Sequence, residues 1–264
     1  MSQIDPDGEI LTRLEDGVFV IGINRPAKYN GFTPKMLREL SAAYTAFERE
    51  DKARVGLLYA EGPHFTAGLD LPKVAPLMGK NNLLVGLGQI DPCNNQSPFR
   101  SKPLVAAVQG ITYTLGIELM LAADMVVAAS DCRFSQLEVK RGIMATGGAT
   151  IRMVERAGWG NAMRYLLTGD EFDVATALRF GFVQEVTEPG GQYAEAMRLA
   201  RSIAAQAPLA LAATIRNARL AVEHGPMAAV EDFRATQQVL MQSQDVKEGV
   251  ASFVERRPAR FTGQ

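Results

Sequence analysis

Five short apolar runs alternate with longer mixed stretches up to about residue 186. The runs are Val18 to Ile23, Val55 to Ala60, Leu104 to Val108, Met125 to Ala129 and Val183 to Val186. Runs of this length, bounded by turn residues, are typical of buried β-strands, and the stretches between them have helical spacing. The pattern predicts an α/β core.

The pattern changes after Pro189-Gly190-Gly191. From there the chain is rich in Ala, Gln, Glu, Arg and Met, with apolar residues at helical spacing. Pro208 and Pro226 stand where new helices are expected to begin, because proline is favoured in the first helical turn. We therefore divide the chain into a core, residues 1–190, and a C-terminal helical region, residues 191–264.

The longest apolar stretch, Leu104 to Ala129, is interrupted by Gln109, Gly110, Glu118 and Asp124. These residues would be costly in a bilayer, so the stretch is predicted to be a buried core segment and not a membrane span. The N-terminus is polar and acidic, unlike a signal or transit peptide. We expect a cytoplasmic protein that binds no membrane.

The amino-acid composition also limits which folds and ligands are expected. The chain has 264 residues, of which 47% are apolar and 22% charged, which is enough to bury a sizeable core. Its 28 basic and 29 acidic residues give a net charge of −1, so no overall field favours nucleic acid. Cys93 and Cys132 form no CxxC pair, and we interpret both as free thiols of a reducing compartment.

Several familiar catalytic motifs are missing from the sequence. It has no P-loop, GxSxG elbow or HExxH motif, and Gly86-Leu87-Gly88 lacks the third glycine of a dinucleotide fingerprint. The only histidines, His64 and His224, have no partner at metal-ligand spacing, so no metal site is expected, and His64 is interpreted as a structural loop residue. Catalysis would then depend on carboxylates and backbone groups.

The segment from Ala60 to Leu71 predicts a strand, a glycine-marked loop and a helix near Asp70. The small residues Ala67 and Gly68 would let a ligand approach the backbone closely. Amide groups at such a turn can face a developing negative charge. An ordinary strand-to-helix turn is the alternative interpretation.

The segment from Lys102 to Asp124 predicts a buried strand, a Gly/Thr turn and a very apolar helix that begins near Leu115. The first amides of a helix lack intrahelical acceptors, so the Leu115 amide could face an anion. Glu118 lies three residues further on, on the same face. A carboxylate in so apolar a helix needs a partner or a shifted pKa, as working acids and bases have, although Glu118 could simply cap its own helix.

The segment from Arg133 to Thr150 places Glu138 in irregular, glycine-rich sequence between a strand and a helix. A loop carboxylate is commonly solvated or paired with a neighbour such as Lys140 or Arg141. Only its combination with the two preceding segments makes Glu138 a candidate for catalysis.

Six ordered motifs resemble the enoyl-CoA hydratase/isomerase (crotonase) family over nearly the whole chain. They are INRP…N from Ile23 to Asn30, FTAGLDL, KPLVAAVQG…GIEL…AAD, FSQLEVKRGI…GG, LTGDEFDVATALRFGFV and the closing FVERRPARF. The resemblance implies a spiral of ββα units followed by C-terminal helices that build homotrimers, often paired into hexamers.

The resemblance also implies roles for individual residues. The backbone amides of Leu69 and Leu115 would form an oxyanion hole for a thioester carbonyl, and Glu118 and Glu138 match the two glutamates of the hydratases. The substrate would be an acyl-CoA thioester, with coenzyme A entering as part of the substrate and no further cofactor. The residues implied in substrate binding are Lys28, Ala67, Gly68, Asp70, Leu71, Gly116 and Phe261.

The sequence departs from the usual family pattern at three positions. Leu115 stands where glycine is commonest in hydratases, Leu69 where alanine is usual, and Gly31 where alanine usually follows Asn30. Two leucines should reshape the acyl pocket, which residues 77–100 are also expected to line. Leucine at position 115 also resembles the family's double-bond isomerases, so three alternatives stay open: a 2-enoyl-CoA hydratase, a Δ3-Δ2-enoyl-CoA isomerase that uses one glutamate, and a non-catalytic acyl-CoA-binding protein.

Overall fold

A six-stranded sheet forms the centre of the computed structural model, which describes residues 5–78 and 85–264. Its strands, in spatial order, are β1 (Glu9–Glu15), β2 (Val18–Asn24), β3 (Val55–Ala60), β4 (Leu104–Val108), β6 (Met125–Ala129) and β9 (Glu185–Thr187). Strands β1 and β2 are antiparallel, and the remaining neighbours are parallel. Asp16 and Gly17 connect β1 to β2 with φ values of 49° and 81°, as a tight hairpin turn requires.

Alternating side chains of the sheet enter two separate cores. Val18 and Val20 of β2 face helix α7 (Gln192–Ala204), which contributes Ala196 and Ala200 to that core. Ile21 lies in the larger core on the opposite face, which also contains residues of α1 (Pro34–Arg49) and α3 (Leu115–Ala122). This period of two is the ordinary geometry of a strand that is covered on both faces.

A second, three-stranded sheet lies beside the first and positions the loops that matter for function. It consists of β5 (Ile111–Tyr113), β7 (Arg133–Ser135) and β8 (Phe172–Asp173). The other short elements of this part are η1 (Pro26–Lys28), α2 (Leu71–Val74), η2 (Ala75–Leu77), η3 (Glu138–Arg141), α4 (Ala149–Ala157), α5 (Trp159–Leu166) and α6 (Val174–Arg179). The expected α/β core is therefore confirmed.

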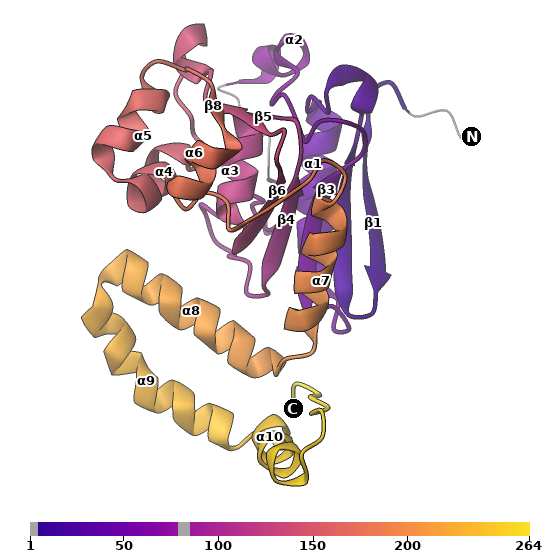
Figure 1. The fold of residues 1–264 in the computed structure, drawn as a ribbon, viewed down its shortest axis with the longest axis vertical. Helices are drawn as coiled ribbons and strands as arrows, with labels where there is room; N and C mark the ends of the chain where they lie inside the picture. The colour runs from indigo at the N-terminus through magenta and orange to yellow at the C-terminus, as the bar shows by residue number, and fades with distance from the viewer. Residues whose placement is uncertain (1–4, 79–84) are drawn as a thin grey trace.

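The last three helices, α8 (Pro208–His224), α9 (Pro226–Met241) and α10 (Gln244–Glu255), form an arm that extends from the core (Figure 1). Pro208 and Pro226 each occupy the first helical turn, as the sequence predicts. Helix α8 contacts the core where Arg219 donates a hydrogen bond to the carbonyl of Arg100. Helix α7 packs against the core sheet. The division of the chain at residue 190, made from the sequence, assigns this helix to the C-terminal region.

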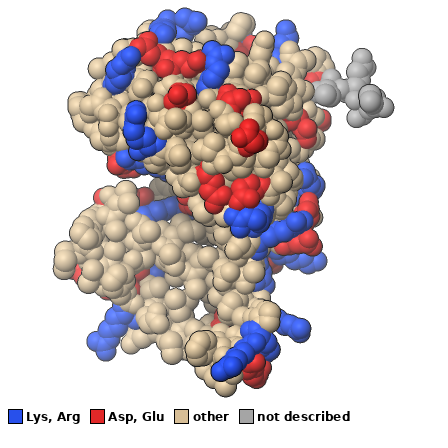
Figure 2. All heavy atoms as spheres, viewed as in Figure 1, with Lys and Arg blue, Asp and Glu red and all other residues tan. Residues whose placement is uncertain are grey.

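Many apolar side chains of the arm are exposed, and much of its surface in Figure 2 is uncharged. Phe253 of α10 is 85% exposed, Val239 of α9 is 68% exposed and Val222 of α8 is 68% exposed. Isolated exposed apolar residues are common on monomers, but a whole arm of them is typical of a surface that another chain covers. Among the described residues, no helix is long and apolar enough to cross a membrane.

Candidate active site

A cavity of about 240 Å³ brings the three candidate segments together. Leu69 and Leu115 lie on its wall, and so do Glu118 and Glu138. The remaining lining residues are Ala67, Leu71, Met78, Thr114, Leu137, Arg141, Ile143, Met144, Ala145, Thr146 and Gly147. A largely apolar cavity with a few convergent polar groups is the usual form of a small-molecule site.

The backbone amides of Leu69 and Leu115 have no acceptor among residues 5–78 and 85–264. Leu115 is the first residue of α3, so its amide cannot bond within the helix. The amides on either side of Leu69 are occupied: Gly68 donates to the Thr66 hydroxyl at 3.0 Å, and Asp70 donates to the carbonyl of Phe32 at 2.9 Å. Two free donors on the wall of one cavity can bind a carbonyl oxygen that gains negative charge.

Gly68 and Thr114 hold these two donors near each other. A Cβ on Gly68 would lie only 1.8 Å from the Thr114 hydroxyl oxygen, and Gly68 has φ 98°, so only glycine fits here. Thr114 itself has φ 50° and ψ −115°, which is strained for a β-branched residue. Each of these residues directly precedes one of the leucines, so their close approach sets the separation of the two amides.

Glu118 is 5% exposed and lies within the most apolar helix of the core. Its carboxylate accepts a hydrogen bond from the amide of Ala149 at 3.4 Å. Burial raises the pKa of Glu118, while the amides of Ala149 and Gly147 and the charge of Arg152 act in the opposite direction. Burial in α3 therefore makes the ionised form of Glu118 costly. Ala149, Gly147 and Arg152 offset part of this cost.

Glu138 is the first residue of η3 and has a different environment. Burial raises its pKa to about 7, and the charge of Glu118 adds to the increase. In the orientation of the buried Gln136 amide that satisfies both of its polar atoms, its nitrogen donates to the two Glu138 oxygens at 3.1 and 2.9 Å, which acts against burial by favouring the ionised form. Glu138 can thus be protonated or ionised near neutral pH, as a group that transfers protons must be.

A family profile described as enoyl-CoA hydratase/isomerase matches residues 13–264. The chain belongs to the enoyl-CoA hydratase/isomerase family. A probable enoyl-CoA hydratase/isomerase from Mycobacterium abscessus is 48% identical, and its crystal structure superposes with a TM-score of 0.93 over 97% of this chain and 98% of that chain. The resemblance inferred from the six motifs and the crotonase-like fold are thereby confirmed.

Curated relatives of this family carry names of more than one activity. The enoyl-CoA hydratase EchA19 of Mycobacterium tuberculosis is 28% identical over 99% of both chains. The 1,2-epoxyphenylacetyl-CoA isomerase of Escherichia coli is 30% identical over 97% of this chain and 98% of the relative. These relatives share the family with this chain, and their names include both a hydratase and an isomerase.

The remaining residues implied by the family resemblance divide into two groups. Ala67 and Leu71 line the cavity, whereas Gly116 is not part of its wall and packs against Thr66, whose methyl group would lie 2.8 Å from a Cβ at this position. The Asp70 carboxylate instead pairs with Arg25 at 2.8 Å, so it fixes the loop. His64 likewise serves the scaffold by accepting from the Ile111 amide at 3.1 Å.

Two further residues implied in substrate binding, Lys28 and Phe261, are not part of the cavity wall. Lys28 is exposed in η1 and is not part of the cavity wall. Phe261 lies at the end of the arm, where its carbonyl accepts from Arg54 at 2.6 Å and its ring is close to Gly249. Phe261 is not among the residues that line the cavity.

The structure also reveals site residues that sequence reasoning missed. Gln136 contacts Glu138, and the Thr114 hydroxyl occupies the space that a side chain on Gly68 would need. Arg152 of α4 donates to the carbonyl of Gly147 at 3.3 Å and affects Glu118 through its charge. In the sequence, only the position of Gln136 two residues before Glu138 could have indicated one of these residues. The contacts of Arg152 and Thr114 join segments that are distant in the sequence.

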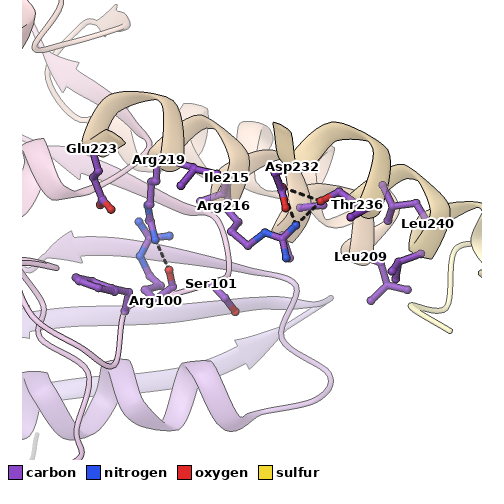
Figure 3. A pocket seen from close by; sticks show the side chains of 16 residues that line it. Arg100, Ser101, Leu209, Ile215, Arg216, Arg219, Glu223, Asp232, Thr236 and Leu240 are labelled. Carbon is purple, nitrogen blue, oxygen red and sulfur yellow. Dashed lines mark hydrogen bonds and ion pairs between the residues drawn. The ribbon is translucent and has the colours of Figure 1, made fainter. Parts of the chain in front are cut away.

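A larger cavity of about 690 Å³ lies between the core and the arm (Figure 3). Arg100 and Ser101 line it from the core, and Arg216, Asp232 and Thr236 form a hydrogen-bonded cluster on α8 and α9. Its two carboxylates are Glu223 and Asp232, and Asp232 is held by Arg216 and Thr236, so this cavity differs from the smaller one, where two carboxylates lie with the amides of Leu69 and Leu115. Within the described part of the chain, no group of three or more His, Cys, Asp or Glu residues could hold a metal ion.

Proposed function

We propose that the protein is a 2-enoyl-CoA hydratase that adds water across the C2=C3 double bond of an acyl-CoA thioester. The observation that carries this proposal is the presence of Glu118 and Glu138 in one cavity with the unpaired amides of Leu69 and Leu115. Hydration needs an acceptor for the proton of water, a donor of a proton to C2 and stabilisation of an enolate oxygen. These groups supply all three functions.

The reaction proceeds through an enolate in this proposal. The amides of Leu69 and Leu115 bind the thioester oxygen. Glu118 removes a proton from water while the water oxygen bonds to C3, and the electrons of the double bond move toward the thioester oxygen. Glu138 then gives its proton to C2, which restores the carbonyl. Product release and proton exchange with solvent return Glu118 to its ionised form and Glu138 to its protonated form.

Burial raises the pKa of both glutamates, but their other neighbours differ, and this difference supports the division of roles. Donation from Ala149 and the charge of Arg152 favour ionised Glu118, which suits a base. The pKa of Glu138, about 7, leaves a large protonated fraction at neutral pH, which suits an acid. Because neighbouring carboxyl groups titrate as a coupled pair, the two apparent pKa values belong to the pair.

A Δ3-Δ2-enoyl-CoA isomerase is the second candidate, since a single carboxyl group with a pKa near neutrality can move a proton between two carbons. In that case Glu138 would act and Glu118 would be a spectator. A non-catalytic acyl-CoA-binding protein is the third. It has less support because such a protein would gain nothing from two carboxyl groups with raised pKa values.

The decisive experiment gives the purified protein crotonyl-CoA and a 3-enoyl-CoA in separate reactions and identifies the products. Formation of 3-hydroxybutyryl-CoA from crotonyl-CoA supports the hydratase. Conversion of the 3-enoyl-CoA to the 2-enoyl-CoA without hydration of crotonyl-CoA supports the isomerase. Binding of both thioesters without turnover supports the non-catalytic protein.

We further propose that the arm assembles the chain into a homotrimer or a dimer of trimers. The exposed apolar residues of α8, α9 and α10, together with the cavity between arm and core, offer a large surface for a neighbouring chain. Light scattering at micromolar concentration should give a trimer or hexamer, and a monomer would contradict this. Removal of residues 253–264 should weaken both assembly and coenzyme A binding if Phe261 serves a neighbouring site.

A further inference from the structure

Arg141 is the only cationic side chain among the described residues that line the active-site cavity. The other charged lining residues are Glu118 and Glu138, and most of the remaining wall is apolar. The proposed hydration mechanism has no use for a guanidinium group in this cavity. Its guanidinium is therefore available to a ligand group that the mechanism does not include.

The position of Arg141 follows from the geometry of η3. A 3-10 helix has three residues per turn, so Glu138 and Arg141, at its two ends, project from the same face one turn apart. Arg141 is exposed, which places it where the cavity opens to solvent. The adjacent Lys140 projects elsewhere, with its side-chain carbons close to Gly169. One turn of helix thus separates the reacting carbons from a positive charge.

No protein group neutralises this charge. The guanidinium donates one hydrogen bond, to the carbonyl of Lys140 at 3.2 Å, and pairs with no carboxylate among residues 5–78 and 85–264. The segments outside those ranges, residues 1–4 and 79–84, contain no Asp or Glu. Most donors of this guanidinium are available to a ligand.

We propose that Arg141 binds a carboxylate at the far end of the acyl chain, so that the substrates are coenzyme A monothioesters of unsaturated dicarboxylic acids. This inference rests on the proposed function for the placement of the thioester. With the thioester oxygen at Leu69 and Leu115 and C2 near Glu138, a short acyl chain can extend along η3 to Arg141. Arginine suits this role because its planar donors match a carboxylate in a bidentate manner.

The phosphates of coenzyme A are the other anions that could reach a guanidinium group. They are separated from the thioester by the long pantetheine arm, whereas Arg141 is on the wall of the same 240 Å³ cavity as both glutamates. In this proposal the acyl portion occupies the cavity and the phosphates lie outside it. A carboxylate on the acyl chain is the anion that fits this position.

Binding of two saturated thioesters tests the proposal without turnover. Isothermal titration calorimetry should show that the full-length protein binds hexanedioyl-CoA more tightly than hexanoyl-CoA, which has six acyl carbons but no distal charge. Arg141→Met should reduce this preference by about tenfold, the lower end of the range for a charge-assisted hydrogen bond, because the guanidinium is exposed. Arg141→Lys should keep part of the preference, and added salt should reduce it in the unmodified protein.

Lys140→Met is the matched control, because it removes the same charge from the same helix at a position outside the cavity wall. It should leave the ratio of the two dissociation constants unchanged. Equal binding of both thioesters by the unmodified protein would overturn the proposal. So would an equal loss for both in Arg141→Met, since that result assigns the guanidinium to the coenzyme A portion.

Turnover is measured separately with hex-2-enoyl-CoA and hex-2-enedioyl-CoA. Absence of hydration with both would refute the proposed hydratase but would leave the ratio of binding constants as a valid test of Arg141. Hydration of both, without any preference in binding or in kcat/KM, would refute the distal carboxylate site alone. The two ideas therefore fail in distinguishable ways.

Discussion

Glu118 accepts a hydrogen bond from the amide of Ala149, which is the first residue of α4. The first amides of a helix carry partial positive charge, so this contact favours the ionised carboxylate. Gly147 makes the approach possible, since a Cβ there would lie 2.5 Å from a Glu118 oxygen. A catalytic carboxylate in the apolar helix α3 thus depends on the start of another helix.

Arg152 should act as a positioning residue for this contact. It donates to the carbonyls of Gly147 and Asn94, each at 3.3 Å, and its charge lowers the pKa of Glu118. Arg152→Met should reduce kcat about tenfold and raise the pKa of Glu118, so that the acidic limb of the rate profile moves to higher pH. Arg152→Lys should restore part of that shift. An unchanged acidic limb in the folded Met variant would refute the role.

Replacement of either glutamate should lower kcat nearly as much as replacement of both. Glu118→Gln and Glu138→Gln should each lower kcat at least about a hundredfold, because both carboxyl groups act on one water molecule in one transition state. The double variant should lose little more than either single variant. Binding of coenzyme A itself should be nearly unchanged in all three. Near-normal hydration by a folded Glu118→Gln protein would exclude the mechanism with two carboxylates.

The pH dependence of kcat/KM should have two limbs with assignable causes. Activity requires protonated Glu138, so it should fall as the pH rises above about 7, the pKa of that group. It also requires ionised Glu118, so it should fall on the acidic side as the pH drops through the raised pKa of Glu118. Stopped assays across the pH range would measure both limbs. The residual activity of Glu138→Gln should lack the alkaline limb.

Loss of Glu138 should stabilise the folded protein at alkaline pH. Its pKa rises from an ordinary value of 4.5 to about 7 on folding, so the folded state binds more protons than the unfolded state between these values. Stability from this group is complete below pH 4.5 and is lost as the pH rises through about 7. Glu138→Gln should therefore gain about 1–2 kcal/mol at pH 8, with a discount for partial exposure, and nothing at pH 4.5. Urea unfolding at both pH values measures the difference.

Much of the fold could be predicted because the buried strands have a clear sequence pattern. The predicted limits of β3, β4 and β6 match the structure, and α3 begins at Leu115 as expected. The run from Val183 to Val186 was placed too early, since β9 is Glu185–Thr187. Val183 is apolar because it packs in the main core, so its burial resembled that of a strand residue.

The strands that were missed lack such a pattern. Strand β1 is an edge strand with exposed residues such as Arg13, so its sequence shows no clear alternation of apolar and polar residues. Strands β5, β7 and β8 have two or three residues each, which is too short for any periodicity. Both candidate glutamates could be identified from the sequence. Their partners could not, because Arg152 and Gln136 act through contacts that exist only after distant segments have packed together.

The oxyanion hole should depend on the close packing of Gly68 against Thr114. A methyl group on Gly68 would lie 1.8 Å from the Thr114 hydroxyl oxygen, so Gly68→Ala must push the loop of Leu69 away from the start of α3. We expect kcat to fall about a hundredfold or more, the loss associated with one misplaced oxyanion donor, while the pH limbs that belong to Glu118 and Glu138 stay in place.

A second substitution separates this effect from general damage. Thr114→Ala removes the hydroxyl group that the new methyl group would meet, so Gly68→Ala with Thr114→Ala should recover part of the lost activity. Recovery should be incomplete because residue 68 has φ 98°, which strains any residue other than glycine. Thr114→Ala alone should change kcat only slightly, since it keeps both amides. If a folded Gly68→Ala protein retained nearly full activity, the thioester oxygen would have to be bound away from the amides of Leu69 and Leu115.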